Sequence, residues 1–262
     1  MTVRAKKHLG QHFLTDKNIC KKVADQYRSH DGCTKVLEIG PGMGALTEFL
    51  LEREELDVHV MEIDRDSVAY LKAHFPKLTN KIHGADFLKT DLSQIMGKNS
   101  FGVVGNFPYN ISSQILFKCI EHRNQIPEIM GMFQKEVAVR IAEKPGSKAY
   151  GILSVLLQTY YDIDYCFTVD EHVFNPPPKV KSGVIRCTRN KRTTLPCDEA
   201  FFIKVVKATF NQRRKTIRNG LKVLVDVAPL SHPFFELRAE RLSVDDFIEL
   251  TCYLEGELNL RI

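Results

Sequence analysis

The stretch Val36-Leu-Glu-Ile-Gly-Pro-Gly-Met-Gly44 decides the fold of this 262-residue chain. Its apolar beginning predicts a short buried strand, and the apolar spacing after Gly44 predicts a helix. The alternating glycines permit a tight turn between the two elements and let the backbone approach a ligand closely. Glu62 follows about 20 residues later, at the end of the next predicted strand, where a carboxylate can accept both hydroxyls of a ribose. The stretch therefore predicts a strand–turn–helix unit that binds a nucleoside-containing ligand.

Two ligand classes use such a turn, and the turn alone does not choose between them. The spacing Gly40-x-Gly42-x-x-Ala45 satisfies a loose dinucleotide pattern. The form E-x-G-x-G-x-G, which begins here at Glu38, is usual for S-adenosylmethionine. A glycine turn without a ligand is the third interpretation, so the rest of the chain has to decide.

Strands and helices alternate on both sides of this turn. Short apolar runs alternate with helix-like segments from Thr34 to Asn190, which indicates an α/β fold with a Rossmann-like, seven-stranded parallel sheet. A polar, proline-containing tract at 190–196 is typical of a linker, and the apolar spacing after it is helical. We therefore predict a ligand-binding domain at 1–190 and a small all-helical domain at 191–262. The predicted strands are 35–39, 57–63, 81–85, 101–105, 129–133, 163–169 and 183–187, and the predicted helices between them include 43–53, 66–74 and 112–122, the last with Ser112 as its cap.

The third predicted strand is followed by Asp86 and Phe87. A carboxylate in this place can accept the amino group of an adenine, and the aromatic ring can cover the base. By itself an Asp-Phe pair is a weak signal, and an ordinary loop explains it as well.

The fourth predicted strand ends in Gly105-Asn-Phe-Pro-Tyr109. This turn fits the (Asn/Asp/Ser)-x-Pro-(Tyr/Phe) form found in methyltransferases that act on exocyclic amines of bases. The Oδ1 atom of Asn106 and the carbonyl of Pro108 can accept the two N–H groups of such an amine and aim its lone pair at a methyl group. Tyr109 can stack on the extruded base. The turn favours S-adenosylmethionine over a dinucleotide as the ligand.

Basic residues are concentrated in two segments of a chain whose net charge is +5. Residues 1–22 contain six basic residues and one acid, Asp16. Residues 203–222 contain seven basic residues and no acid. Two such segments in one chain make a polyanionic partner about as good an explanation as two solvated helix faces. The seven cations of the second segment are Lys204, Lys207, Arg213, Arg214, Lys215, Arg218 and Lys222.

Composition excludes several classes of protein. Hydrophobic residues make up 44% and charged residues 26% of the chain, which is typical of globular proteins and not of disordered or coiled-coil ones. Apolar runs stay shorter than the roughly 18 residues of a membrane span, so we expect no membrane partner. The seven cysteines are scattered without a C-x-x-C pair, and the histidines lack H-x-x-x-H spacing, so we expect a reducing cytoplasm and no metal.

With these motifs in place, the chain resembles the KsgA family, the small-subunit ribosomal RNA adenine dimethyltransferases. The resemblance covers nearly the whole chain. Its first motifs are shared with the macrolide-resistance methyltransferases of large-subunit RNA, whereas the blocks at 147–151 and 211–216 favour the small-subunit group. The matching blocks are 7–14, 38–44, 106–112, 134–136, 147–154, 173–182, 210–219 and 238–243.

The resemblance implies the activity and the roles of individual residues. It implies four methyl transfers from S-adenosylmethionine to two adjacent adenosines in the 3′-terminal hairpin of small-subunit ribosomal RNA, by a monomer that acts in ribosome biogenesis. Asn106, Pro108 and Tyr109 would hold the target adenine, and Phe174 would stack on its other face. The basic segment at 203–222 would contact the RNA. The implied cofactor residues are His12, Leu14, Gly40, Gly42, Glu62, Asp86, Phe87 and Asn106.

Two positions depart from the common form of the family: His12 stands where many members have Asn, and Phe107 where Leu is usual. An imidazole can still donate a hydrogen bond, and the middle position of the turn needs only an apolar side chain. Two alternative functions stay open, namely a large-subunit methyltransferase and a non-catalytic RNA-binding assembly or transcription factor. An oxidoreductase with a dinucleotide is a more distant alternative.

Overall fold

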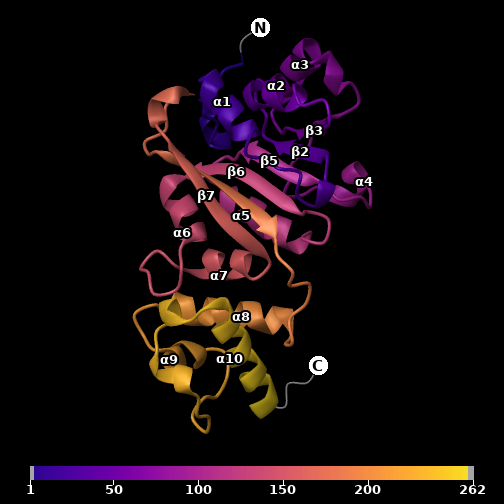
Figure 1. Cartoon of the computed structure of the whole chain (residues 1–262). Coiled ribbons are helices and arrows are strands. Elements are labelled where there is room, and N and C mark those ends of the chain that lie inside the picture. The colour runs from indigo at the N-terminus through magenta and orange to yellow at the C-terminus, as the bar shows by residue number, and fades with distance from the viewer. Residues whose placement is uncertain (1–2, 259–262) are drawn as a thin grey trace. The chain divides into compact units, whose positions relative to one another are not determined.

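The computed structural model describes residues 3–258, and the chain divides into two compact units (Figure 1). Unit 1 comprises Met1–Ala138 and Asp162–Arg189, and unit 2 comprises Val139–Tyr161 and Asn190–Ile262. The boundary predicted at 190 assigns 139–161 to the first domain, whereas the structure groups this segment with the C-terminal helices. The reason is packing, because helix α7 (Ile152–Gln158) contacts helices α8 (Glu199–Asn211) and α10 (Val244–Glu257).

Unit 1 is built on a seven-stranded sheet with the order β4-β3-β2-β5-β6-β9-β7. Strands β2 to β6 pair in parallel, with Val36 opposite Val58 on one side and Gly102 on the other. The predicted α/β class is confirmed, but the sheet is mixed, because β9 runs antiparallel to β6. An apolar pattern is the same in both directions along a strand, so it does not reveal this reversal. The strands are β2 (Lys35–Ile39), β3 (Asp57–Met61), β4 (Ile82–His83), β5 (Gly102–Asn106), β6 (Glu128–Gln134), β7 (Tyr161–Val169) and β9 (Ser182–Arg189).

Aspartate side chains cap three helices of unit 1. Asp16 accepts backbone N–H groups at the start of α1, Asp64 does so at α3, and Asp91 does so at α4. Ser112 is not the predicted cap: it is the first residue of α5, and its hydroxyl donates to the carbonyl of Tyr109 over 3.2 Å. The helices are α1 (Lys17–Ala24), α2 (Ala45–Leu51), α3 (Arg65–His74), α4 (Leu92–Met96) and α5 (Ser112–Glu121), with short 3-10 helices at Lys7–Leu9, His30–Gly32, Pro76–Leu78 and Glu171–Val173. Helix α6 (Lys135–Ala142) begins in unit 1, and its residues from Val139 onward belong to unit 2.

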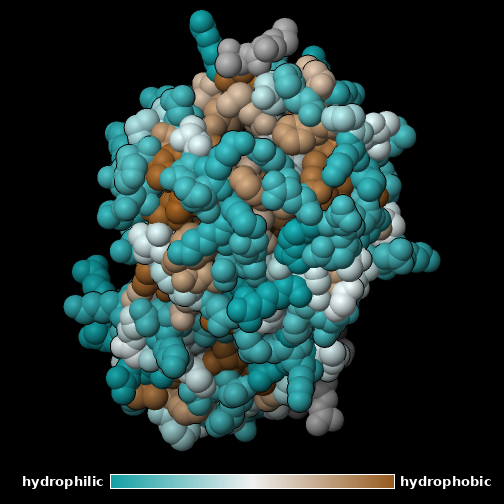
Figure 2. Space-filling model, turned by 45° about the horizontal axis from the view of Figure 1, so that its top comes forward, coloured by the Kyte–Doolittle hydropathy of each residue, from teal (hydrophilic) through white to brown (hydrophobic). Residues whose placement is uncertain are grey.

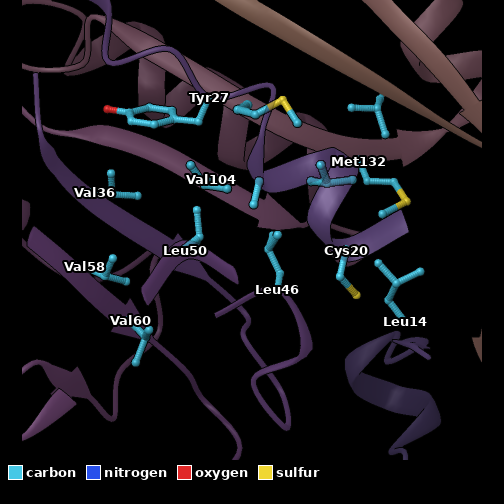
Figure 3. Close-up of a cluster of buried hydrophobic side chains, with 14 of the residues drawn as sticks. Leu14, Cys20, Tyr27, Val36, Leu46, Leu50, Val58, Val60, Val104 and Met132 are labelled. Atoms are coloured by element: carbon cyan, nitrogen blue, oxygen red, sulfur yellow. The ribbon is translucent and has the colours of Figure 1, made fainter. Parts of the chain in front are cut away.

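One hydrophobic cluster joins the helices α1, α2 and α3 to the sheet (Figure 3). Val58 and Val104 from the strands meet Leu46 and Leu50 from α2, and these side chains are buried. Residues that alternate with them along the strands, such as Leu37, are also buried. Successive side chains of a strand point to opposite faces, so both faces of the sheet are covered, as parallel strands require.

The N-terminal arm adds a second, two-stranded sheet that the apolar pattern does not predict. Strand β1 (Phe13–Leu14) pairs antiparallel with β8 (Phe174–Asn175), with Leu14 opposite Phe174. Thr15 continues the pairing, because its backbone N–H and its hydroxyl both donate to the carbonyl of Val173 over 2.9 Å. The arm is thereby fixed to the chain that leads into β9.

Unit 2 is helical. The ring of Phe210 packs edge-on against Tyr150 and at a tilt against Phe247, with centroid distances of 6.1 and 5.7 Å. The last helix, α10, begins with a capping box, in which the hydroxyl of Ser243 accepts the backbone N–H of Asp246. Besides α7, α8 and α10, the unit contains α9 (Ile217–Leu221) and 3-10 helices at Pro233–Glu236 and Ala239–Arg241.

The face of the molecule drawn in Figure 2 is mainly polar. On the face drawn in Figure 2, hydrophilic side chains predominate and hydrophobic ones form small separate patches. Among residues 3–258, no helix is long and apolar enough to span a bilayer.

Candidate functional site

A cavity of about 280 Å³ lies in unit 1 where β2, β3 and β5 end. Ligands of open α/β sheets bind at this edge, outside the carboxyl ends of the strands. The turn after each of these strands contributes to the lining, and so does the N-terminal arm at 8–14. Of the residues expected at the site, Phe174 lies outside the cavity. The others all line it, namely His12, Leu14, Gly40, Gly42, Glu62, Asp86, Phe87, Asn106, Pro108 and Tyr109.

The glycine turn after β2 needs glycine for two reasons. Gly40 and Gly42 both have positive φ angles, of 66° and 57°, which other residues rarely adopt. In addition, a Cβ atom at Gly42 would lie 2.7 Å from the ring of Phe13. The N-terminal arm therefore packs closely against Gly42, and the ring of Phe13 occupies the space that a side chain at Gly42 would take.

Glu62 is buried at the end of β3 and is held by the backbone. Its Oε2 accepts the N–H of Gly42 over 3.0 Å, and its Oε1 accepts the N–H of Asp64 over 2.9 Å. Burial raises the pKa of the Glu62 carboxyl, although these two hydrogen bonds favour the carboxylate. Each oxygen still has a lone pair, so the carboxylate fits a pair of ribose hydroxyls.

Glu38 is a second buried acid of the cavity lining, and its side chain was not singled out from the sequence. Its Oε2 accepts the hydroxyl of Thr47 over 2.6 Å. Complete burial raises the pKa of Glu38 to about 8, although the Thr47 hydroxyl favours the carboxylate. A glutamate within a glycine motif looks like part of the pattern, and only its burial shows that it holds its proton at neutral pH.

The loop after β4 presents Asp86 at the cavity. Asp86 Oδ1 accepts the N–H of Leu88 over 2.9 Å, and Oδ2 lies 3.9 Å from the ammonium of the exposed Lys89, beyond hydrogen-bond distance, so Oδ2 can accept an amino group. Phe87 lines the cavity but is only 4% exposed, so its ring offers little face to a base. Ile63 is 52% exposed at the same cavity and offers much more apolar surface, and sequence reasoning missed it.

Asn106 is oriented by the arm. Its Nδ2 donates to the backbone carbonyl of His12 over 2.9 Å. A carbonyl oxygen only accepts hydrogen bonds, so it selects the Nδ2 side of the amide and leaves Oδ1 as the free acceptor. This hydrogen bond joins residues 94 positions apart in the chain. It leaves Oδ1 as the acceptor that the turn needs for a base amine.

The rest of the turn is held from several sides. Phe107 is buried against Phe133, with ring centroids 5.1 Å apart, so the expectation that an apolar side chain suffices here agrees with the structure. Tyr109 Oη lies 2.6 Å from Ser182 Oγ, and burial raises the pKa of the Tyr109 phenol. His12 stacks on Tyr109 with centroids 5.6 Å apart.

His12 also bonds to the loop before β9. Its Nδ1 lies 2.7 Å from the carbonyl of Pro176. The carbonyl only accepts, so Nδ1 carries the proton, and the second ring nitrogen, Nε2, is the acceptor of the neutral ring. The imidazole of His12, which stands where many members of the family have an amide, is thus held in place both by stacking and by a hydrogen bond.

The arm itself is held by Asp64. Lys6 forms an ion pair with Asp64, and the Nε2 of Gln11 donates to the same carboxylate over 3.0 Å. Burial alone would raise the pKa of Asp64, but the hydrogen bonds from Lys6 and Gln11 outweigh it and lower the pKa. Lys6 is therefore engaged within unit 1 and does not contribute a free charge to the basic N-terminal segment.

Phe174 differs from its expected role. Its side chain is 3% exposed and belongs to the hydrophobic cluster that also contains Leu14. Pairing of β8 with β1 turns the side chain into this cluster, so in this conformation it has no face for a base. The sequence favoured stacking on the base over packing for this phenylalanine, whereas pairing with β1 packs it in the cluster in the conformation described here.

The basic segment of unit 2 is not one helix, because it is divided between α8, a turn and α9. Backbone carbonyls of the same unit hold two of its arginines. Arg213 donates to the carbonyls of Ser147 and Tyr150, and Arg218 donates to the carbonyls of Val227 and Leu230. The other five cations of the segment are exposed: Lys204, Lys207, Arg214, Lys215 and Lys222.

Within residues 3–258, no group of three or more His, Cys, Asp or Glu side chains is arranged to hold a metal ion. The seven cysteines are present as free thiols.

The sequence matches a family of known proteins. Residues 2–255 match the family described as ribosomal RNA adenine dimethylase. The ribosomal RNA small subunit methyltransferase A of Cytophaga hutchinsonii is 56% identical over 256 residues, which cover 97% of this chain and 99% of that protein. The protein of the same name from Flavobacterium johnsoniae is also 56% identical over 256 residues, which cover 97% of both chains.

Two solved structures share the fold. A dimethyladenosine transferase from Plasmodium falciparum has a TM-score of 0.75 and 24% identity, over 95% of this chain and 98% of that one. The 23S rRNA methyltransferase ErmE has a TM-score of 0.64 and 25% identity, over 92% of this chain and 99% of that one.

Proposed function

Because this chain belongs to the ribosomal RNA adenine dimethylase family, we propose that it transfers methyl groups from S-adenosylmethionine to two adjacent adenosines in the 3′-terminal hairpin of small-subunit ribosomal RNA. The observation that carries the proposal is the orientation of Asn106, whose Nδ2 is tied to the His12 carbonyl so that Oδ1 is left to accept a base amine. The activity and the cofactor follow from the family, whereas the RNA substrate and the role of each residue are the proposal.

We infer that S-adenosylmethionine lies along the cavity. Glu62 accepts the two ribose hydroxyls with the lone pairs that its backbone bonds leave free. Asp86 Oδ2 accepts the adenine amino group, and the exposed side chain of Ile63 packs on the ring, with Phe87 behind it. The methionine end lies against His12, Leu14, Gly40 and Gly42. The bound cofactor supplies a sulfonium methyl group that a nitrogen can attack directly.

The turn after β5 holds the target adenine. Asn106 Oδ1 and the Pro108 carbonyl each accept one N–H of the exocyclic amine and direct its lone pair towards the cofactor. The Pro108 carbonyl already accepts the N–H of Ile111 over 3.1 Å, and its second lone pair takes the amine. His12 covers one face of Tyr109, and the other face of that ring stacks on the base.

Catalysis then depends on positioning and on the exclusion of water. A general base is not required, because an ammonium on a methylated adenine is a strong acid that releases its proton to water. The second transfer to the same nitrogen needs room for the first methyl group, so the amine must rotate between Asn106 and Pro108.

Unit 2 supplies the exposed cations for the RNA. Arg214 and Lys215 stand in the turn between α8 and α9, and both are exposed. A phosphate backbone relieves the repulsion between such like charges and releases counterions. We place the protein in the cytoplasm as a monomer that acts on a precursor of the small ribosomal subunit.

One experiment separates this proposal from its alternatives. Unmethylated small and large ribosomal subunits are incubated with the protein and isotope-labelled S-adenosylmethionine, and the RNA is analysed by mass spectrometry, with Asn106→Ala as the inactive control. We expect dimethyladenosine at two adjacent positions of small-subunit RNA only. Label in large-subunit RNA would establish the macrolide-resistance alternative. Binding without label would establish a non-catalytic RNA-binding factor, which the intact Asn106–Tyr109 turn argues against.

A further inference from the structure

Lys118 lies in the last turn of α5 and reaches back to a single loop. Its Nζ donates to the carbonyls of Phe87, over 2.7 Å, of Leu88, over 3.3 Å, and of Thr90. An ammonium has three N–H donors and no acceptor, so these three carbonyls use its full capacity. The Nζ also lies 5.3 Å from the centroid of the Phe87 ring, which adds a cation–π contact.

We propose that Lys118 is a positioning residue for the cofactor: it holds the loop at 86–90 in the shape that presents Asp86 to the adenine amino group. The inference rests on the proposed role of Asp86. It concerns a residue of α5 that does not line the cavity and that acts only through the loop that it binds.

The loop has an internal framework that brings its carbonyls together. The N–H groups of Lys89 and Thr90 and the hydroxyl of Thr90 donate to the backbone carbonyl of Asp86. Asp86 Oδ1 accepts the N–H of Leu88, so the orientation of the carboxylate depends on the path of the next two residues. Oδ2 lies 3.9 Å from the exposed ammonium of Lys89 in the same loop. A change in the path of the loop moves Oδ2 away from the place where an adenine amine would meet it.

The ammonium of lysine, a point charge with three N–H donors, suits position 118 better than the groups of other side chains. The three carbonyls belong to a span of four residues and converge on one nitrogen atom. The planar guanidinium of arginine presents its donors as a fork and cannot reproduce that convergence. Methionine fills the volume and leaves three carbonyls without their partner. We therefore expect function to decrease in the order Lys, Arg, Met.

Calorimetry with the full-length protein tests the inference, with S-adenosylhomocysteine as the probe. Lys118→Met should raise its Kd about 10- to 100-fold, the range that corresponds to the loss of one charge-assisted hydrogen bond. Lys118→Arg should raise it less. Lys72→Met, at an exposed lysine of α3, is the matched control and should leave the Kd unchanged. In turnover, the KM for S-adenosylmethionine should rise in Lys118→Met while kcat at saturating cofactor changes less than threefold.

A double-mutant cycle with Asp86→Ala distinguishes positioning from general destabilisation. If Lys118 acts through Asp86, then Lys118→Met should raise the Kd less than threefold once Asp86 is absent. Equal effects of Lys118→Met in both backgrounds would overturn the inference, and so would a wild-type Kd in Lys118→Met. If Lys118→Met does not fold, Lys118→Gln is used instead in the same cycle.

The cycle also separates this inference from the proposed function. An unchanged Kd in Asp86→Ala would refute the adenine contact itself, and the inference about Lys118 with it. A weakened Asp86→Ala together with an unaffected Lys118→Met would refute only the role of Lys118.

Discussion

Gly131 of β6 gives space to the residue at the middle of the proposed catalytic turn, and filling that space should impair both stability and catalysis. A Cβ atom at Gly131 would lie 2.2 Å from Cε2 and 2.8 Å from Cδ2 of Phe107. Carbon atoms in contact prefer a separation of about 3.5–4.0 Å, so the ring of Phe107 must move by at least about 1 Å. Phe107 is 1% exposed and packs edge-on against Phe133, which leaves the ring little room to retreat.

The expected size of the effect follows from this overlap. Inserting a methyl group into a packed core costs about 1–3 kcal/mol of the free energy of unfolding. Phe107 stands between Asn106 and Pro108, so a shift of the ring displaces both acceptors of the target amine. A misplacement of about 1 Å can reduce a rate by about 10²-fold. Gly131→Ala should therefore lower kcat by about that factor, while the Kd for S-adenosylhomocysteine, measured by calorimetry, changes little.

A second substitution shows whether the clash is the cause. Phe107→Leu removes the part of the ring that the new methyl group meets, so the double variant should recover kcat and should be about 1–3 kcal/mol more stable than the sum of the single effects. Gly105→Ala is the control, because its Cβ would also lie 2.7 Å from the backbone carbonyl of Ile39, which Phe107→Leu cannot relieve. Denaturant unfolding and turnover on unmethylated small subunits measure both quantities. Wild-type stability and kcat in Gly131→Ala would refute the reasoning, as would equal rescue of the two glycine variants.

Three further predictions test the site and the RNA-binding surface. Asn106→Ala should lower kcat by about 10²–10³-fold with little change in the cofactor Kd, as expected for the loss of one positioned contact in the transition state. Glu62→Ala should instead chiefly raise the cofactor Kd. Calorimetry and turnover measure both quantities, and the same pattern in the two variants would contradict the assignments. The pKa of Glu38 is raised from its ordinary 4.5 to about 8, so between these pH values the folded state holds a proton that the unfolded chain has released. The free energy of unfolding should therefore fall over this range by up to about 1.4 kcal/mol per pH unit, and Glu38→Gln should remove that slope in unfolding curves recorded from pH 5 to 8. The same pH dependence of stability in the wild type and the variant would contradict this prediction. Neutralising the exposed Arg214 and Lys215 together should weaken binding to small subunits and flatten its salt dependence by about 1–2 units of log–log slope, without a change in cofactor affinity or melting temperature; an identical salt slope would show that these charges only face solvent.

Local patterns were sufficient wherever one segment of chain determines its own structure. The tight turn at Gly40 and Gly42 was expected from the glycine spacing, and both residues have the positive φ angles that few other residues adopt. Ser243 caps the last helix through contacts within four residues, and such contacts can be read from the sequence. The strands of the large sheet were predicted for the same reason, since apolar alternation is a property of each strand.

Contacts between distant segments could not be predicted in this way. The pairing of Leu14 with Phe174 buries that phenylalanine outside the cavity, and it depends on the register of two strands 160 positions apart (14 and 174). Arg213 was expected on an RNA-binding face, yet the carbonyls of Ser147 and Tyr150 engage it within unit 2. A cation in a basic segment has the same sequence signal whether it meets a phosphate or a carbonyl.

The sequence by itself therefore determined the class of fold, the place of the cavity at the strand ends and the residue types that surround it, because turns, strands and caps are set by neighbouring residues. Only the tertiary structure decided how those residues are aimed. The carbonyl of His12 selects the rotation of Asn106, the backbone of Gly42 orients Glu62, and the ammonium of Lys118 gathers the loop of Asp86. In each case the partner comes from a different element, and its position exists only once the sheet has brought the elements together.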